Sequence, residues 1–151
     1  MPVTRPEKEI DMRLIIVLFI SFLCYIPSAL AESKATAYLV KQEIARGCDG
    51  KKGTIEKSAI IERDLTGDGR KDLIISHEGL TCAGDERKRS GFCGIRVCSF
   101  NIYIRRGKLL KLQIEMLGMG LHVTKGRIPT IHWYAHDGSA QKFRWDGKRF
   151  R

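Results

Sequence analysis

Acidic residues are scarce in the second half of this 151-residue sequence. From Arg87 to Arg151 the chain carries 15 Lys and Arg residues against three Asp and Glu residues, a net charge of +12, whereas residues 32–86 carry −2. Because a glycosidase needs a pair of carboxyl groups, this scarcity argues against that class of enzyme. The positive excess predicts a surface that attracts polyanions, and the alternative is a solvated surface that keeps the protein soluble.

Motifs of common enzymes are also missing. The sequence has no Gly-x-Ser-x-Gly nucleophile elbow and no His-Glu-x-x-His zinc motif. His122, His132 and His136 could supply nitrogen ligands to a transition metal, but the aromatic stretch around His132 favours structural histidines. We therefore expect a protein that is not an enzyme.

A targeting segment opens the chain. An apolar run over residues 14–23 is followed by an Ala-x-Ala sequence that ends at Ala31. This pattern predicts a secretory signal peptide over residues 1–31, with either Met1 or Met12 as the start. The apolar run is too short for a membrane anchor, and no second run predicts a transmembrane span. The remaining residues, 32–151, are expected to form a single exported domain, periplasmic or secreted.

The cysteines agree with export. Five occur, and Cys24 falls inside the predicted signal peptide. An even number in a small exported domain predicts two disulfides, which would be formed by Cys48, Cys82, Cys93 and Cys98. Three pairings are possible, and we expect Cys82–Cys93 together with Cys48–Cys98. A four-cysteine zinc site is disfavoured because the sequence lacks paired Cys-x-x-Cys motifs.

The hydrophobic pattern predicts an α+β fold. It consists of one N-terminal helix and a six- to seven-stranded, mostly antiparallel sheet, stapled by disulfides. The helix is expected over residues 34–46, with Ser33 as its cap and Gly47 at its end. Strands are expected over residues 57–63, 72–76, 92–104, 109–117, 129–135 and 140–145. The sequence Gly118-Met119-Gly120 is expected to end the strand that begins at residue 109.

An Asp-rich stretch between the first two strands is the main candidate for chemistry. It runs Asp64-Leu-Thr-Gly-Asp-Gly-Arg-Lys-Asp72. Oxygen atoms at this spacing can surround one Ca²⁺ ion, and the predicted ligands are Asp64, Thr66, Asp68, the carbonyl of Arg70, and Asp72. An EF-hand is excluded because Ile75 stands at its twelfth position and the flanking segments are strands. The alternative is a metal-free turn whose Asp side chains accept hydrogen bonds from nearby backbone N–H groups.

The same stretch, together with Leu73-Ile74-Ile75, resembles the calcium-binding turn of FG-GAP or VCBS repeat proteins. In that family an Asp-x-Asn/Asp-x-Asp-Gly-x-x-Asp loop joins two strands of a propeller blade. The resemblance implies a structural Ca²⁺ ion, bound by the Asp64, Asp68 and Asp72 carboxylates and the Arg70 carbonyl. It covers about 12 residues and does not repeat, so a propeller is not expected in a chain of this size.

A second resemblance extends along more of the chain. The order of an export signal, an Asp-rich loop, Cys93-Gly94-Ile95-Arg96-Val97-Cys98 at the start of a strand, and a terminal Trp145-Asp146-Gly147 is similar to small uncharacterised exported bacterial proteins. The resemblance implies a compartment and a general build, and it implies no activity.

The C-terminus is basic and aromatic. Its candidate anion-binding residues are Lys142, Arg144, Lys148 and Arg149. Because neighbouring residues of a strand point to opposite faces, we expect Phe143 and Trp145 to face the core and the cations to face water. The sequence predicts a protein that binds an anionic envelope polymer, a lipid surface or another protein, whereas nucleic acid is not expected. The alternative function is a small periplasmic hydrolase that depends on a divalent ion.

Overall fold

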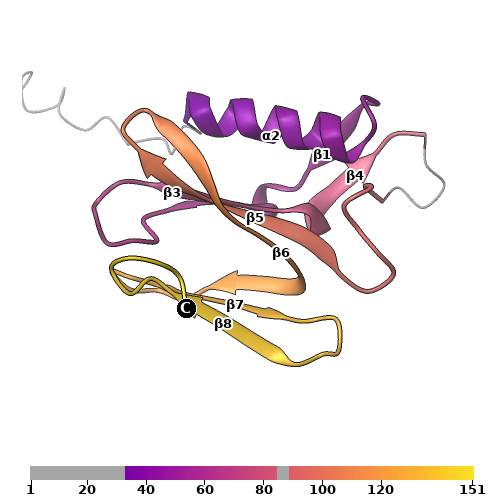
Figure 1. The fold of residues 1–151 in the computed structure, drawn as a ribbon. Coiled ribbons are helices and arrows are strands. Elements are labelled where there is room, and N and C mark those ends of the chain that lie inside the picture. Colours follow the sequence, from indigo (N-terminus) through magenta and orange to yellow (C-terminus); the bar gives the residue numbers. More distant parts are fainter. Residues whose placement is uncertain (1–32, 85–88) are drawn as a thin grey trace, which may run out of the picture. The chain divides into compact units, whose positions relative to one another are not determined.

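A computed structural model describes residues 33–84 and 89–151, and the predicted signal peptide lies outside this part of the chain. The described residues form one α-helix and eight strands, in agreement with the predicted α+β class (Figure 1). The elements in order are α2 (Lys34–Gly47), β1 (Gly53–Ile55), the 3₁₀ turn η1 (Lys57–Ala59), β2 (Ile60–Arg63), β3 (Asp72–Ser76), the 3₁₀ turn η2 (His77–Gly79), β4 (Leu80–Cys82), β5 (Cys98–Arg106), β6 (Leu109–Val123), β7 (Thr130–Tyr134) and β8 (Ala140–Arg144).

Helix α2 begins and ends where its sequence signals predict. The hydroxyl of Ser33 accepts a hydrogen bond from the Thr36 amide at 3.2 Å, which satisfies one of the free N–H groups of the first turn. At the other end, a β-carbon on Gly47 would lie 2.6 Å from Leu80 and 2.8 Å from Phe92, so a glycine is needed for close packing. No described helix has both the length and the apolar character needed to span a membrane.

The strands form two antiparallel sheets. The larger has six strands in the order β2-β3-β5-β6-β7-β8, and the smaller pairs β1 with β4. The small sheet was not predicted, because strands of three residues carry too little periodicity to be recognised. Two predicted strands are also shorter than expected: residues 57–59 form η1, and residues 92–97 form a loop before β5.

Strand β6 does not end at Gly118-Met119-Gly120, and that prediction is wrong. Its first part pairs with β5 as far as Gly118, and its last part pairs with β7 from Met119 to Val123. A side chain on Gly118 would collide with the indole of Trp133, and Gly120 has a φ of 63° beside a shift in register. The glycines therefore bend the strand, and the bend carries it from one layer of the fold to the next.

The bend places β7 and β8 on the opposite side of the β3–β5 strands from α2 (Figure 1). Alternate residues of β3 consequently point into two different cores. Ile74 packs with Phe100 and Trp133 in the core beneath the sheet. Leu73 and Ile75 belong to the second core, which Leu39 and Val40 of α2 cover, and every residue of β3 is buried.

Candidate functional site

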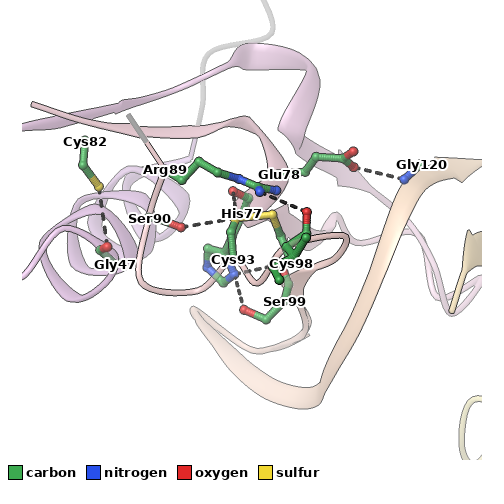
Figure 2. Close-up of a disulfide and its surroundings, with 11 residues drawn as sticks. Gly47, His77, Glu78, Cys82, Arg89, Ser90, Cys93, Cys98, Ser99 and Gly120 are labelled. Carbon is green, nitrogen blue, oxygen red and sulfur yellow. Dashed lines mark hydrogen bonds between the residues drawn. A yellow bond between two sulfur atoms is a disulfide. The ribbon is translucent and has the colours of Figure 1, made fainter. Parts of the chain in front are cut away.

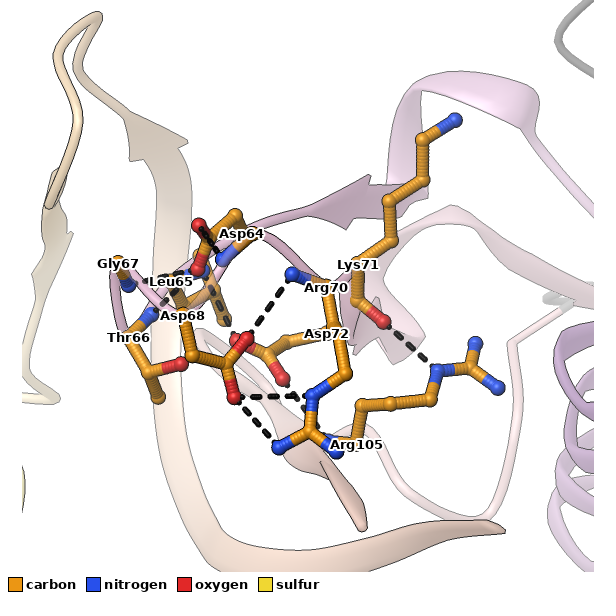
Figure 3. A network of polar contacts seen from close by, with 10 residues as sticks. Asp64, Leu65, Thr66, Gly67, Asp68, Arg70, Lys71, Asp72 and Arg105 are labelled. Atoms are coloured by element: carbon orange, nitrogen blue, oxygen red, sulfur yellow. Dashed lines mark hydrogen bonds and ion pairs between the residues drawn. The ribbon is translucent and has the colours of Figure 1, made fainter. Parts of the chain in front are cut away.

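The Asp-rich loop between β2 and β3 is closed by its own carboxylates (Figure 3). Asp64 Oδ1 accepts hydrogen bonds from the amides of Thr66 at 3.1 Å and Gly67 at 2.6 Å. Asp64 Oδ2 accepts a third, from the amide of Gly69 at 2.8 Å. One side chain therefore satisfies three N–H groups of the turn, which is the role that short polar side chains play in tight loops.

Asp72 ties this loop to the sheet. Its buried carboxylate accepts hydrogen bonds from the amide of Leu65 at 2.9 Å and from the amide of Arg105 on β5 at 2.8 Å. Burial raises the pKa of Asp72 above its ordinary value, although these two hydrogen bonds oppose the rise. Asp68 lies outside this arrangement, where hydrogen bonds from Arg70 lower its pKa.

These contacts leave calcium binding as a prediction. Each oxygen of Asp64 and Asp72 already accepts a backbone hydrogen bond, so a Ca²⁺ ion would have to share them. The hydroxyl of Thr66 is buried without a hydrogen-bond partner, and a bound Ca²⁺ ion would supply one. Within residues 33–84 and 89–151, no three His, Cys, Asp or Glu side chains are gathered as a metal site would require. The metal-free turn accounts for the geometry of the carboxylates.

The two disulfides are present, but the expected pairing is wrong. Cys48 is bonded to Cys82. Cys93 is bonded to Cys98, as Figure 2 shows. Cys82 of β4 pairs with Gly53 of β1 in the small sheet. Cys82 and Leu80 pack in one core cluster with Cys48, which follows the end of α2, so the two cysteines lie together. Cys93 and Cys98 face each other in a β-bridge, which closes a short hairpin loop. Two disulfides are compatible with the oxidising compartment expected of an exported protein.

A buried polar network joins α2 to the sheet, and it was not predicted. His77 Nε2 lies 3.1 Å from a Glu43 carboxylate oxygen, and its Nδ1 lies 2.8 Å from the hydroxyl and 3.0 Å from the carbonyl oxygen of Ser99. The phenol of Tyr103 also donates to Glu43, at 2.8 Å. The sequence does indicate that Glu43 is buried, because it falls four residues after Leu39 and so lies on the packed side of the helix.

The network has the order of a nucleophile, a base and an acid, but its burial argues for a structural role. His77 is 1% exposed and Glu43 2% exposed, so neither is open to a substrate. Burial opposes ionisation of Glu43, yet hydrogen bonds from His77 and Tyr103 lower its pKa overall. Burial and the hydrogen bond to Glu43 raise the pKa of Tyr103, so the phenol stays a donor. The arrangement holds the helix on the sheet.

A row of basic side chains lies on the face of β6, β7 and β8 that points away from the core. His122 of β6 is opposite His132 of β7, and His132 is opposite Lys142 of β8. The two imidazole rings stack, with centroids 4.9 Å apart and an angle of 8° between their planes. Directly opposite residues of an antiparallel sheet share a face, so these three side chains form one row across three strands.

A second row of cations lies beside the first. Arg144 of β8 follows Lys142 by two residues and therefore shares its face. The terminal Arg151 exchanges backbone hydrogen bonds with Arg144 at 2.8 and 3.1 Å, which places its side chain on that face as well. We call the surface formed by these two rows the outer face; its residues are His122, His132, Lys142, Arg144 and Arg151.

The aromatic residues of the C-terminus face inward, as predicted. Phe143 and Trp145 pack against the core beneath the sheet, together with Phe150. Lys148 and Arg149, the other two candidate anion-binding residues, lie in an exposed turn outside the two rows. Their backbone amides donate to Asp146, and these bonds lower the pKa of that carboxyl to about 2.

The chain matches no model of a protein family, no curated protein and no solved structure. The two resemblances stated above therefore rest on the residues quoted for them. The function is accordingly inferred from the geometry of the described residues.

Proposed function

We propose that this protein is an exported, non-enzymatic domain that binds an anionic polymer of the cell envelope through its outer face. The observation that carries the proposal is the placement of Lys142 and Arg144 beside His122 and His132 on one side of a three-stranded layer. A flat surface with regularly spaced cations suits a long polyanion, which can meet several charges at once.

The charges of the outer face are available to a ligand. Lys142 and Arg144 are exposed, and neither forms an ion pair with any residue in the described part of the chain. Arg151 does form one, with Asp146, so it is the weaker candidate. Phe143 and Trp145 are packed inward, so the exposed aromatic side chain of this face is that of Tyr134, and one such ring is fewer than a membrane-binding surface presents. A polymer therefore suits the face better than a lipid surface does.

The alternative function, a hydrolase that depends on a divalent ion, is supported in the described residues only by the unpartnered hydroxyl of Thr66. His122 and His132 contact each other, and the Asp64 and Asp72 carboxylates accept backbone hydrogen bonds within their own loop.

The proposal is tested by measuring binding of the purified, oxidised protein to polyphosphate as a model polyanion. Dissociation constants are compared at about 50 and about 200 mM salt, because screening weakens contacts between exposed charges. Vesicles that contain an anionic phospholipid form a second arm, which distinguishes a lipid surface from a free polymer. We expect binding to polyphosphate that weakens at higher salt.

Charge-removing variants locate the site. The double substitution Lys142→Ala/Arg144→Ala is expected to weaken binding about tenfold, since two exposed ion contacts are lost. The matched control is Lys34→Ala/Lys57→Ala, which removes the same charge from exposed positions on α2 and η1. Equal losses for the two pairs would show that net charge alone attracts the polymer and would overturn the assignment of the outer face.

A further inference from the structure

The two histidines of the outer face are an unusual component for a site that binds anions. Lys142 and Arg144 carry their charge at every physiological pH, whereas imidazole gains its charge between about pH 8 and pH 5. His122 is exposed and His132 half-buried, and their rings are stacked at the centre of the row that Lys142 extends. Solvent protons can therefore reach a part of the proposed binding surface whose charge is variable.

We propose that the stacked His122 and His132 make the outer face a pH-dependent site, which binds its polyanion more tightly near pH 5.5 than near pH 7.5. The inference rests on the proposed function and adds its regulation. A phosphate or carboxylate group of the polymer would lie across the two rings and next to the Lys142 ammonium group. The ligand chemistry is that of a repeating oxyanion.

The physical basis is the repulsion between neighbouring cations. If both rings are protonated, two positive charges lie about one strand spacing apart, and the Lys142 ammonium adds a third at a similar distance. An oxyanion that bridges these groups removes the repulsion and gains an attraction to each charge. Protonation and polymer binding therefore favour each other, and the protein must take up protons when it binds at intermediate pH.

Other ionisable groups near the pair do not cancel this effect. Cations on the same face are Lys142 and Arg144 of β8 and Arg151, which is paired with Asp146, and Tyr134 is the ionisable neighbour on β7. His136 and Asp137 lie in the turn that follows β7. An acid from another element, Glu78, accepts a hydrogen bond from the Gly120 amide of β6 at 3.0 Å. Positive groups thus outnumber acids around the two rings.

The experiment measures polyphosphate binding at about pH 5.5 and about pH 7.5, at one ionic strength. We expect the protein to bind about tenfold more tightly at the lower pH, the effect of two added charges on an exposed contact. The double variant His122→Gln/His132→Gln should reduce this ratio to less than about twofold. The matched control His136→Gln, which changes a histidine of the adjacent turn, should retain the ratio of the unmodified protein.

A second measurement does not depend on any variant. Calorimetric titration of the unmodified protein with polyphosphate near pH 6.5, in buffers of different ionisation enthalpy, should show net proton uptake on binding. Binding at both pH values with no proton uptake, or a pH ratio that survives the double substitution, would overturn this inference and leave the proposed function standing. Absence of binding at both pH values would overturn the two together.

Discussion

The phenol of Tyr103 donates a hydrogen bond to the Glu43 carboxylate at 2.8 Å and thereby joins the centre of the sheet to helix α2. Both side chains are buried, and the amide of Asn101 donates to the same phenol oxygen at 3.2 Å. A buried carboxylate loses its hydration, so each donor that replaces water contributes to keeping the helix in place.

The substitution Tyr103→Phe tests this contact. It removes a donor from the buried Glu43 carboxylate and the acceptor of the Asn101 amide, so we expect a loss of about 1–3 kcal/mol in the free energy of unfolding. Urea denaturation at neutral pH measures the loss. The matched control is Tyr134→Phe, which removes a phenol hydroxyl from an exposed tyrosine of β7. If the two substitutions have equal effects, the hydrogen bond to Glu43 does not stabilise the fold.

The same carboxylate predicts a dependence of stability on pH. The pKa of Glu43 is lower in the folded protein than the ordinary value of a glutamate, so its charge stabilises the fold above that value and the stabilisation is lost as the pH falls through the lowered pKa. Asp72 has the opposite sign, because its raised pKa means that protonation favours the folded state. We therefore expect Glu43→Gln to destabilise the protein strongly near pH 6.5 and much less near pH 3.5. Urea denaturation at both pH values measures the difference. The control is Glu115→Gln, which changes an exposed glutamate of β6. An equal effect of Glu43→Gln at the two pH values would contradict the expectation.

Local signals in the sequence predicted the elements that depend on them. Ser33 and Gly47 mark the two ends of α2, and the buried apolar run after the Asp-rich loop gave β3 at its observed bounds, Asp72–Ser76. The alternation of Phe143 and Trp145 with basic residues also placed the C-terminal cations on the exposed face. In each case the information lies within a few residues of the element.

Features that depend on distant contacts could not be predicted in this way. Gly118 reads as a strand breaker, yet it is a glycine because the Trp133 indole occupies the space of a side chain. The outer face exists because the β6–β7 register sets His122 opposite His132, and spacing along one strand carries no information about that register. Glu43 and His77 likewise meet across 34 residues of sequence.

Calcium binding to the Asp-rich loop remains a prediction of the resemblance, and melting experiments test it. A ligand that binds the folded state alone stabilises it by about 2.7 kcal/mol at a concentration of 100 times its dissociation constant. The hypothesis predicts that the melting temperature rises with added Ca²⁺, falls with chelator, and stops responding in Asp68→Asn. Asp137→Asn, in the turn after β7, is the matched control. An identical melting temperature with Ca²⁺ and with chelator would establish the loop as a metal-free turn.

The disulfide pairing predicts the products of tryptic digestion under non-reducing conditions. Cleavage after Lys and Arg separates all four cysteines of the domain, because Arg96 lies between Cys93 and Cys98. The bonds Cys48–Cys82 and Cys93–Cys98 should join peptide 47–51 to 72–87 and peptide 90–96 to 97–105. Mass spectrometry identifies the joined pairs, and a product that joins 72–87 to 90–96 would show the pairing first expected from the sequence.

The two bonds should also differ in their effect on stability. Cys48–Cys82 spans 34 residues and Cys93–Cys98 spans five. A crosslink stabilises a protein chiefly by restricting the unfolded chain, and the restriction grows with the length of the closed loop. We expect Cys48→Ser/Cys82→Ser to lower the free energy of unfolding by about 4 kcal/mol and Cys93→Ser/Cys98→Ser by about 2 kcal/mol. Urea denaturation of the two double variants measures both values. The reverse order would mean that the short Cys93–Cys98 loop stabilises the native contacts around it, including those of His77 with Phe92 and Ser99.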